Sequence, residues 1–210
     1  MLDIVPNHMA ASSENPWWMD VLENGHSSSY ARYFDIDWQP MASPGRLAQE
    51  TKIILPILGS SLETTLQRKE FGLRFEEGAF FVSYYDNKLP LDPKSYPLLL
   101  EDALARLRES PSPEASTLEE LAAVISLARE LPDRTTADPQ QINRRRKQTR
   151  QLKERLEDLG QSHPQLYQAL EEILQTFSGR KNDRSGIEGL RGLLAGQAYR
   201  LAYWQTALEE

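Results

Sequence analysis

The sequence predicts a mainly helical fold with short β elements, in two parts that meet near residue 95. Before that position, short apolar runs are separated by Gly, Pro and Ser, which is typical of strands and loops. After it, apolar residues recur every three or four positions, as in amphipathic helices. We therefore expect a β-containing region over residues 1–95, a helical lobe over 96–196 and a short final segment over 197–210.

The chain opens with a short apolar run that ends in polar residues. Residues 2–5 form the run, Asp3 lies inside it, and Asn7 and His8 follow Pro6. A run of this kind, ended by proline, is typical of a buried parallel strand leaving a sheet. Asn7 and His8 then stand at the carboxyl end of the strand, where α/β barrels place their sites.

The rest of the first part is expected to contain short elements. Asn15 before Pro16 predicts a helix start, because the Asn side chain accepts hydrogen bonds from free backbone N–H groups. The clearest β element is a hairpin that turns at Glu76-Glu77-Gly78. In order, we expect a helix from Asn15 to Gly25, a short helix from Ser27–Ser29 through Phe34, an extended stretch to Trp38, a loop over 39–49, an edge strand over 53–58, a helix from Ser60 to Lys69 and the hairpin over 72–85.

The second part is expected to contain helices separated by Pro- and Ser-rich breaks. Ser116 with Glu119, and Ser162 with Gln165, have the spacing of a capping box. The expected segments are a helix from residue 96 to 107, a linker over 110–113, helices from 116 to 132, 138 to 159 and 162 to 177, a short or interrupted helix over 178–196 and an extended end over 199–204.

Composition argues against several classes of function. The net charge of −7 gives no support for binding nucleic acid or an anionic membrane, since phosphate binding relies on clustered Lys and Arg. The chain has no cysteine, and its three histidines are too far apart for a metal-ligand motif. No apolar run approaches the length of a membrane span. We expect a cytoplasmic protein that needs no cofactor or metal.

Several stretches together resemble a known family. Residues 3–8, Asp-Ile-Val-Pro-Asn-His, match the first signature of the alpha-amylase superfamily (glycoside hydrolase family thirteen), which lies at the end of the third barrel strand. Five further stretches narrow the resemblance to the maltooligosyl trehalose synthase family of intramolecular glucosyl mutases. They are Asn15-Pro16-Trp17-Trp18, Tyr33-Phe34-Asp35-Ile36-Asp37-Trp38, Tyr84-Tyr85-Asp86, Pro90-Leu91-Asp92-Pro93-Lys94-Ser95-Tyr96-Pro97 and Gln197-Ala198-Tyr199-Arg200-Leu201-Ala202-Tyr203-Trp204.

The resemblance implies that this chain is an internal piece of a much larger enzyme. Its first and last segments would belong to a partial (β/α)8 barrel, and the helical lobe would be inserted between the third and fourth barrel strands, beside the sugar site. The later signatures, which carry the catalytic carboxylates, would lie outside the chain. We therefore expect the isolated chain to be inactive, to require the remainder of the parent enzyme, and to associate or be partly disordered when expressed alone.

Contacts with a maltooligosaccharide are expected from His8, Asn7, Asp3, Trp18 and Trp38. The resemblance places His8 against the glucosyl unit at the cleavage site and Asp3 as a scaffold carboxylate of the barrel floor. It places Asn7 where many amylases bind a structural calcium, but that ion takes six to eight oxygen ligands and the sequence offers no credible set, so we interpret Asn7 as an orienting side chain behind His8. The two tryptophans each stand beside a polar loop and can stack on a pyranose ring. The alternative is structural, since histidines are often satisfied within a core and aromatic residues at helical spacing are more often buried.

Two charged patterns are interpreted as structural. Asp35 and Asp37 share one face of an extended stretch, and retaining glycosyl transfer needs two carboxyl groups about 5 Å apart. Their family counterparts are not catalytic, so we interpret them as caps or ion pairs and name no catalytic residue in the chain. The basic residues between Arg144 and Arg155 are interpreted as a solvated helix face, with acidic neighbours as countercharges.

The expected activity is isomerisation of the reducing-end α-1,4 linkage of a maltooligosaccharide to an α,α-1,1 linkage, which gives maltooligosyltrehalose. A second hypothesis is another glucan hydrolase or transglycosylase of the same superfamily. A third is a non-catalytic helical interaction module whose opening match is accidental. The first requires Asn7 and His8 to face a cleft, whereas the third lets them pack anywhere.

Overall fold

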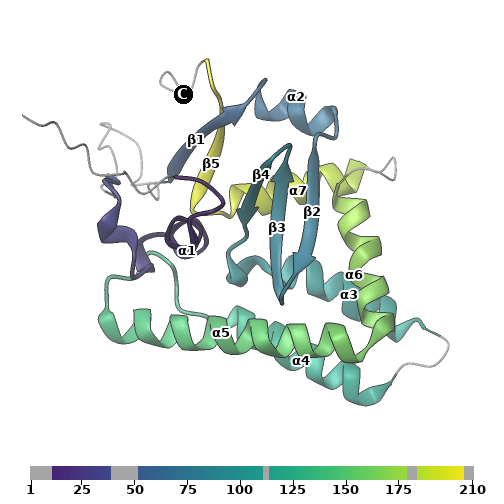
Figure 1. Ribbon diagram of the computed structural model, residues 1–210. Coiled ribbons are helices and arrows are strands. Elements are labelled where there is room, and N and C mark those ends of the chain that lie inside the picture. Colours follow the sequence, from purple (N-terminus) through teal and green to yellow (C-terminus); the bar gives the residue numbers. More distant parts are fainter. Residues whose placement is uncertain (1–10, 39–51, 111–113, 179–183, 206–210) are drawn as a thin grey trace, which may run out of the picture.

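Helices pack around a small antiparallel sheet, and a pair of parallel strands lies beside it (Figure 1). The computed structural model describes residues 11–38, 52–110, 114–178 and 184–205, so the opening run with Asp3, Asn7 and His8 lies outside the described residues, as does the expected loop over 39–49. The elements are α1 (Pro16–Asn24), β1 (Ile53–Leu58), α2 (Leu62–Gln67), β2 (Phe71–Glu76), β3 (Ala79–Tyr84), β4 (Asn87–Pro90), α3 (Pro97–Arg108), α4 (Ala115–Arg129), α5 (Pro139–Ser162), α6 (Pro164–Phe177), α7 (Arg184–Ala195) and β5 (Tyr199–Tyr203), with 3-10 turns at Gly25–Ser27, Ala31–Tyr33 and Pro93–Ser95.

The predicted hairpin is confirmed. Strands β2 and β3 pair antiparallel from Phe71↔Tyr84 to Glu76↔Ala79. The two turn residues, Glu77 and Gly78, have φ angles of 50° and 68°, which a two-residue turn between twisted strands requires. The structure adds β4, which the sequence analysis did not expect and which pairs with β3 to complete the sheet.

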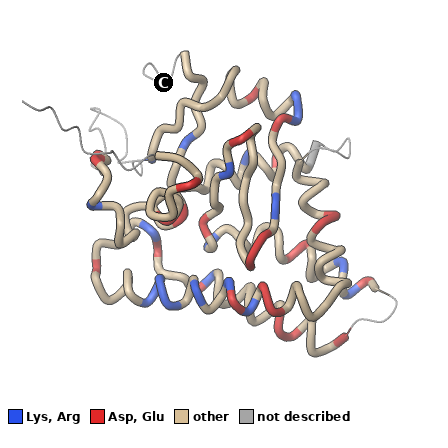
Figure 2. Tube along the Cα trace, in the orientation of Figure 1, with Lys and Arg blue, Asp and Glu red and all other residues tan. Residues whose placement is uncertain are grey.

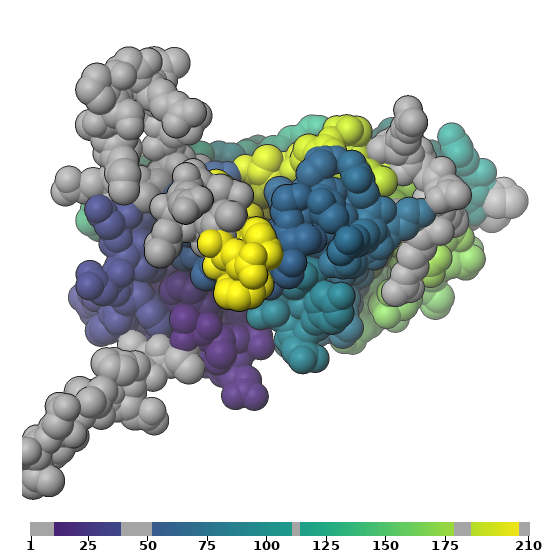
Figure 3. All heavy atoms as spheres, turned by 90° about the horizontal axis from the view of Figure 1, so that it is seen from above, coloured from purple at the N-terminus to yellow at the C-terminus, as the bar shows by residue number. Residues whose placement is uncertain are grey.

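The parallel pair joins segments from distant parts of the chain. Strand β1 pairs with β5, and its register shifts between Leu55 and Leu58, around Pro56. Proline has no backbone N–H to give to a ladder, so it suits the edge position that was predicted for this strand. The extended ending of the chain is confirmed as β5. Figure 3 shows β5 next to α1 on the surface, and a Cβ on Gly25 would lie 3.2 Å from that of Ala198. Assignment of this pair to a barrel stays a proposal.

The helical layer supplies much of the core. The predicted stripe of α3, from Leu99 to Leu107, is buried, and α3 packs against both α4 and α6. Helix α6 also lies against β2, where the Ser178 hydroxyl accepts a hydrogen bond of 3.0 Å from the Leu73 backbone. One hydrophobic cluster includes side chains from both sides of residue 95, and the division of the chain into three parts stays a prediction.

Helix starts are partly as expected. Asn15 and Asp138 cap α1 and α5 with their side chains, as predicted. The cap of α2 is Ser61 rather than Ser60. The two other capping boxes were wrong. Helix α4 begins before Ser116, and Ser162 ends α5 because His163 and Pro164 start the next helix. Proline at the first helical position sets such a boundary, since it disfavours helical geometry in the residue before it.

The helix predicted over 178–196 as short or interrupted is short, since α7 is one continuous helix of 12 residues from Arg184 to Ala195. Its glycines have a packing role. A Cβ on Gly186 would lie 2.3 Å from the Thr176 carbonyl oxygen, and one on Gly189 would lie 2.7 Å from the Phe177 ring. The two glycines therefore let α7 approach the end of α6. No helix in the described part of the chain is long and apolar enough to cross a membrane.

The β2–β3 turn provides a test of this packing. We expect Gly78→Ala to lower the free energy of unfolding by about 2 kcal/mol, because φ is positive there and a Cβ would lie 2.0 Å from the Lys153 carbonyl oxygen on α5. The measurement is urea denaturation. The control is Gly192→Ala on α7, where a Cβ meets nothing within 4 Å. Because alanine favours a helix more than glycine does, this substitution should raise the free energy of unfolding by up to about 1 kcal/mol. Equal effects of the two substitutions would contradict the close packing of the β2–β3 turn against α5.

Candidate binding site

A cavity of about 470 Å³ lies between α1 with the turn that follows it, the β2–β3 turn, and α5. We call it the α1–α5 cavity. Its walls come from parts of the chain that are far apart in sequence, so its shape depends on how α5 is held against α1. Polar and charged side chains form most of its lining.

The floor of the cavity contains an ion pair with a buried carboxylate. Glu23 lies on α1 and is 6% exposed, and its carboxylate pairs with the ammonium of Lys153 on α5. Asn24 also donates a hydrogen bond of 3.3 Å to Glu23. Burial raises the pKa of Glu23, and the nearby Lys153 opposes that rise. The pair therefore links α1 to α5 directly.

A second carboxylate orders the turn after α1. Asp20 accepts a hydrogen bond of 3.1 Å from the side-chain amide of Asn24 and another from the Ser28 hydroxyl. The Ser28 oxygen in turn accepts from the Tyr30 backbone N–H at 3.1 Å. These bonds fix the wall of the cavity that the turn provides.

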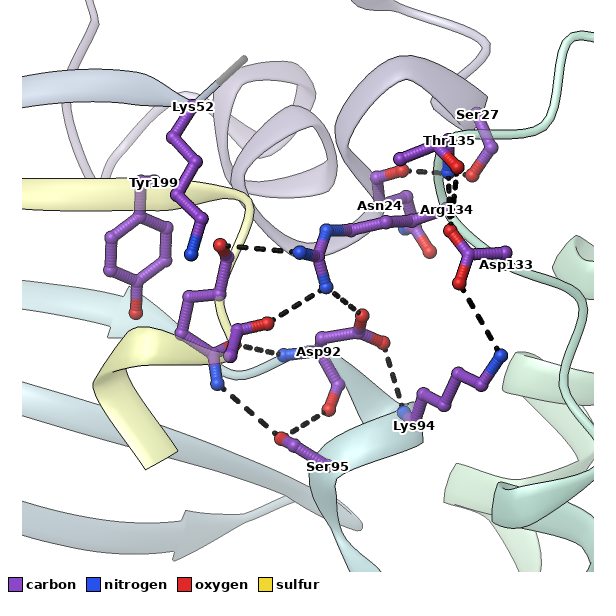
Figure 4. A network of polar contacts seen from close by, with 12 residues as sticks. Asn24, Ser27, Lys52, Asp92, Lys94, Ser95, Asp133, Arg134, Thr135 and Tyr199 are labelled. Atoms are coloured by element: carbon purple, nitrogen blue, oxygen red, sulfur yellow. Dashed lines mark hydrogen bonds and ion pairs between the residues drawn. The ribbon is translucent and has the colours of Figure 1, made fainter. Parts of the chain in front are cut away.

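Behind the cavity lies a buried network centred on Asp92, which is 1% exposed (Figure 4). Its two carboxylate oxygens accept from different arginines, with Arg145 at 2.7 Å and Arg134 at 2.8 Å. Asp92 also caps the turn that follows β4, through the Lys94 backbone N–H at 2.9 Å. Two charge-assisted hydrogen bonds and a backbone donor satisfy this buried carboxylate.

The arginines extend the network to three more segments. Arg145, itself 1% exposed, donates to the Asn24 side-chain oxygen on α1 at 3.2 Å and to the Pro132 carbonyl at 2.7 Å. Arg134 donates to the Gly196 carbonyl at 2.8 Å. Gln197 accepts from the Asp92 backbone N–H at 2.7 Å, between α7 and β5. The network thus fixes α5 relative to α1 and the start of β5.

The burial of Arg145 corrects the interpretation of the basic cluster. Arg144, Arg146, Arg150 and Arg155 are exposed, as expected of a solvated face, but Arg145 is not. A signal was present in the sequence. Position 145 lies three residues after Ile142 and four before Thr149, and so it completes the apolar stripe of α5.

An aromatic cluster adjoins the cavity. Trp17 stacks on Tyr30 with ring centroids 5.1 Å apart and on Tyr33 at 5.5 Å. Trp17 is 40% exposed and Tyr33 is 49% exposed, so their rings reach solvent. Tyr30 also lines the α1–α5 cavity, which makes the cluster continuous with it. Exposed stacked rings beside a polar cavity can pack against the apolar face of a ring-shaped ligand.

The predicted contact residues divide into two groups. Asp3, Asn7 and His8 lie outside the described residues. Trp18 is 8% exposed in the core, where its ring lies 5.1 Å from that of Phe34, and Trp38 is half-buried with its ring 5.7 Å from His26. Their roles as sugar contacts stay predictions, and the exposed ring on α1 belongs to Trp17. Among the described residues, no group of His, Asp or Glu side chains suits a metal ion.

The buried network gives a prediction for Arg145. We expect Arg145→Met to lower the free energy of unfolding by about 3 kcal/mol, because Asp92 loses one of its two cations while it stays buried. Urea denaturation measures the loss. Arg144→Met, on the exposed face of the same helix, should change stability by less than about 0.5 kcal/mol. A similar loss in both variants would show that Arg145 does not hold the network.

Glu23 gives a prediction for pH dependence. Because its pKa is raised above the ordinary value of 4.5, the native state retains a proton that the unfolded chain releases. This group therefore lowers stability as pH rises from about 4.5 through the raised pKa. Glu23→Gln cannot ionise, so its free energy of unfolding should fall less over that range than that of the parent chain. The control is Glu154→Gln, which removes an exposed carboxylate of the same cavity. If the free energy of unfolding of the parent chain and of E23Q changes with pH in parallel, the raised pKa of Glu23 is refuted.

Comparison with known proteins finds a match over part of the chain. A stretch of 62 residues is 45% identical to a Mycobacterium tuberculosis protein named "Putative maltooligosyl trehalose synthase", in strain CDC 1551 and equally in strain H37Rv. No family model matches the chain, and no solved structure matches it significantly. The match covers 29% of this chain and 7% of the relative, so the chain is similar to a small part of a much longer protein.

Proposed function

We propose that this chain is a segment of an α-glucan-acting enzyme that converts the reducing-end α-1,4 linkage of a maltooligosaccharide into an α,α-1,1 linkage. The observation that carries the proposal is the 45% identity over 62 residues to a protein whose name describes this synthase. The opening hexapeptide, residues 3–8, also supports it, because its pattern resembles the end of a barrel strand that contacts sugar.

The reaction divides into two displacements at one anomeric carbon. A carboxylate attacks the anomeric carbon of the penultimate glucosyl unit, and a carboxylic acid protonates O4 of the reducing-end glucose as the glycosidic bond breaks. The resulting carboxylate then takes the proton from the anomeric hydroxyl of that glucose. The anomeric oxygen attacks the same carbon and displaces the first carboxylate. No water is consumed, and we assign neither carboxyl group to this chain.

This chain would hold sugar and exclude water. The released glucose must stay in place between the two displacements, since water would otherwise hydrolyse the covalent intermediate. In our proposal the helical lobe encloses the site. The exposed rings of Trp17 and Tyr33 pack on pyranose faces, in the role that the sequence analysis gave to Trp18 and Trp38. The charged groups behind them are held by the ion pairs of Arg145 with Asp92 and of Lys153 with Glu23.

The test is product formation by the longer protein that contains this chain. Incubated with maltopentaose, it should form maltotriosyltrehalose, with loss of reducing ends and little free glucose, as measured by chromatography and a reducing-end assay. The 210-residue chain alone should form none. Release of glucose or maltose as the main product would instead indicate a hydrolase of the same superfamily. No turnover of any maltooligosaccharide would overturn the proposal.

A matched pair of tryptophan variants refines this test. In the longer protein, Trp17→Ala should raise KM for maltopentaose by about tenfold, because one stacked ring is lost. Trp204→Ala removes a ring that is 61% exposed just after β5 and makes no ring contact with the aromatic cluster, so KM should stay unchanged. Equal effects of the two substitutions on KM would show that the aromatic cluster does not bind the substrate.

A further inference from the structure

The rim of the α1–α5 cavity carries hydrogen-bonding groups that the protein itself does not use. Glu77 on the β2–β3 turn and Arg146 on α5 both line the cavity and are exposed. Within the described ranges, neither side chain makes a hydrogen bond or an ion pair. The Tyr30 hydroxyl and the Ser29 side chain add neutral hydrogen-bonding groups on the opposite wall. The rim therefore offers donors and acceptors together.

The charges around the cavity nearly cancel. Figure 2 shows basic residues along α5, which forms one wall, with acidic residues joining them only towards its C-terminal end. The lining contains five carboxylates and four cationic side chains, namely Asp20, Glu23, Glu77, Glu154 and Glu157 with Arg145, Arg146, Arg150 and Lys153. A phosphate or sulfate would lie close to several carboxylates, and a cation would lie close to several guanidinium groups. The balance favours a ligand without net charge.

The deeper carboxylates of the cavity are engaged by the protein itself, since Glu23 pairs with Lys153 and Asp20 accepts from Ser28. The buried Thr149 hydroxyl on α5, which also lines the cavity, has no hydrogen-bond partner among the described residues. A ligand would gain its hydrogen bonds from the rim and its apolar contact from the ring of Tyr30, which Trp17 holds in place by stacking. Such preorganisation lowers the entropy cost of binding.

We propose that the α1–α5 cavity is a subsite for a short neutral saccharide. Sugar hydroxyls both donate and accept, so different hydroxyls of one saccharide can donate to the Glu77 carboxylate and accept from the Arg146 guanidinium, while the C–H face of a ring packs on Tyr30. The cavity, at about 470 Å³, has the size of small-ligand sites. The choice of an α-glucan as ligand rests on the proposed function, whereas the location and the neutral charge of the ligand rest on the cavity.

The test is direct binding to the longer protein that contains this chain. Maltotriose is titrated into the labelled protein, and amide chemical shifts are followed by NMR. We expect saturable shifts at Tyr30, Glu77 and Arg146. The double variant Glu77→Gln with Arg146→Met should weaken binding at least tenfold. The control is Glu119→Gln with Arg144→Met, which alters one exposed carboxylate and one exposed arginine outside the cavity and should bind as the parent does.

The outcomes separate this inference from the proposed function. Absence of saturable shifts with maltotriose, or equal affinity in the two double variants with matching thermal unfolding, overturns the subsite. Tighter binding of inorganic phosphate than of maltotriose at the same residues also overturns it. Product formation by the longer protein without binding here leaves the proposed function standing alone. Binding here without any product formation leaves the subsite standing and removes the proposed function.

Discussion

The carboxylate of Asp92 is the group on which the arrangement of the chain depends. It lies between two arginines from different segments, and the same arginines reach the end of α1 and the start of β5. A carboxylate buried in this way is tolerated because both of its oxygens are matched by charged donors. The α1–α5 cavity follows from this arrangement, since its walls are the helices that the network holds together.

Local features of the fold could be predicted from the sequence, whereas features made by distant residues could not. The cap at Asn15 and the hairpin turn at Gly78 depend on residues within a few positions of each other, and both are confirmed. The burial of Arg145 depends on Asp92, which lies 53 positions away along the chain. Arginine is seldom buried, so position 145 was predicted to be exposed, although its spacing from the apolar residues of α5 indicated the core.

The candidate site shows the same limit at the scale of a single helix. Trp17 and Trp18 are neighbours in sequence, but successive residues on a helix point about 100° apart. One ring therefore enters the core and the other reaches solvent, and a polar loop nearby does not decide which. The cavity itself could not be predicted, because Glu77 and Arg146 line one cavity only once the β2–β3 turn lies against α5.

The parallel pair of β1 and β5 has a consequence for the order of folding. Its two strands lie on either side of nearly the whole described helical lobe, so they can pair only after most of the chain has closed into a loop. Closing a long loop costs entropy, and the contacts of this one strand pair offset that cost only after the loop has closed. The hairpin and the helical stripes, by contrast, need few residues to form. We expect the lobe to assemble first, and β5 to dock on β1 as a late step that joins the two ends of a nearly complete structure.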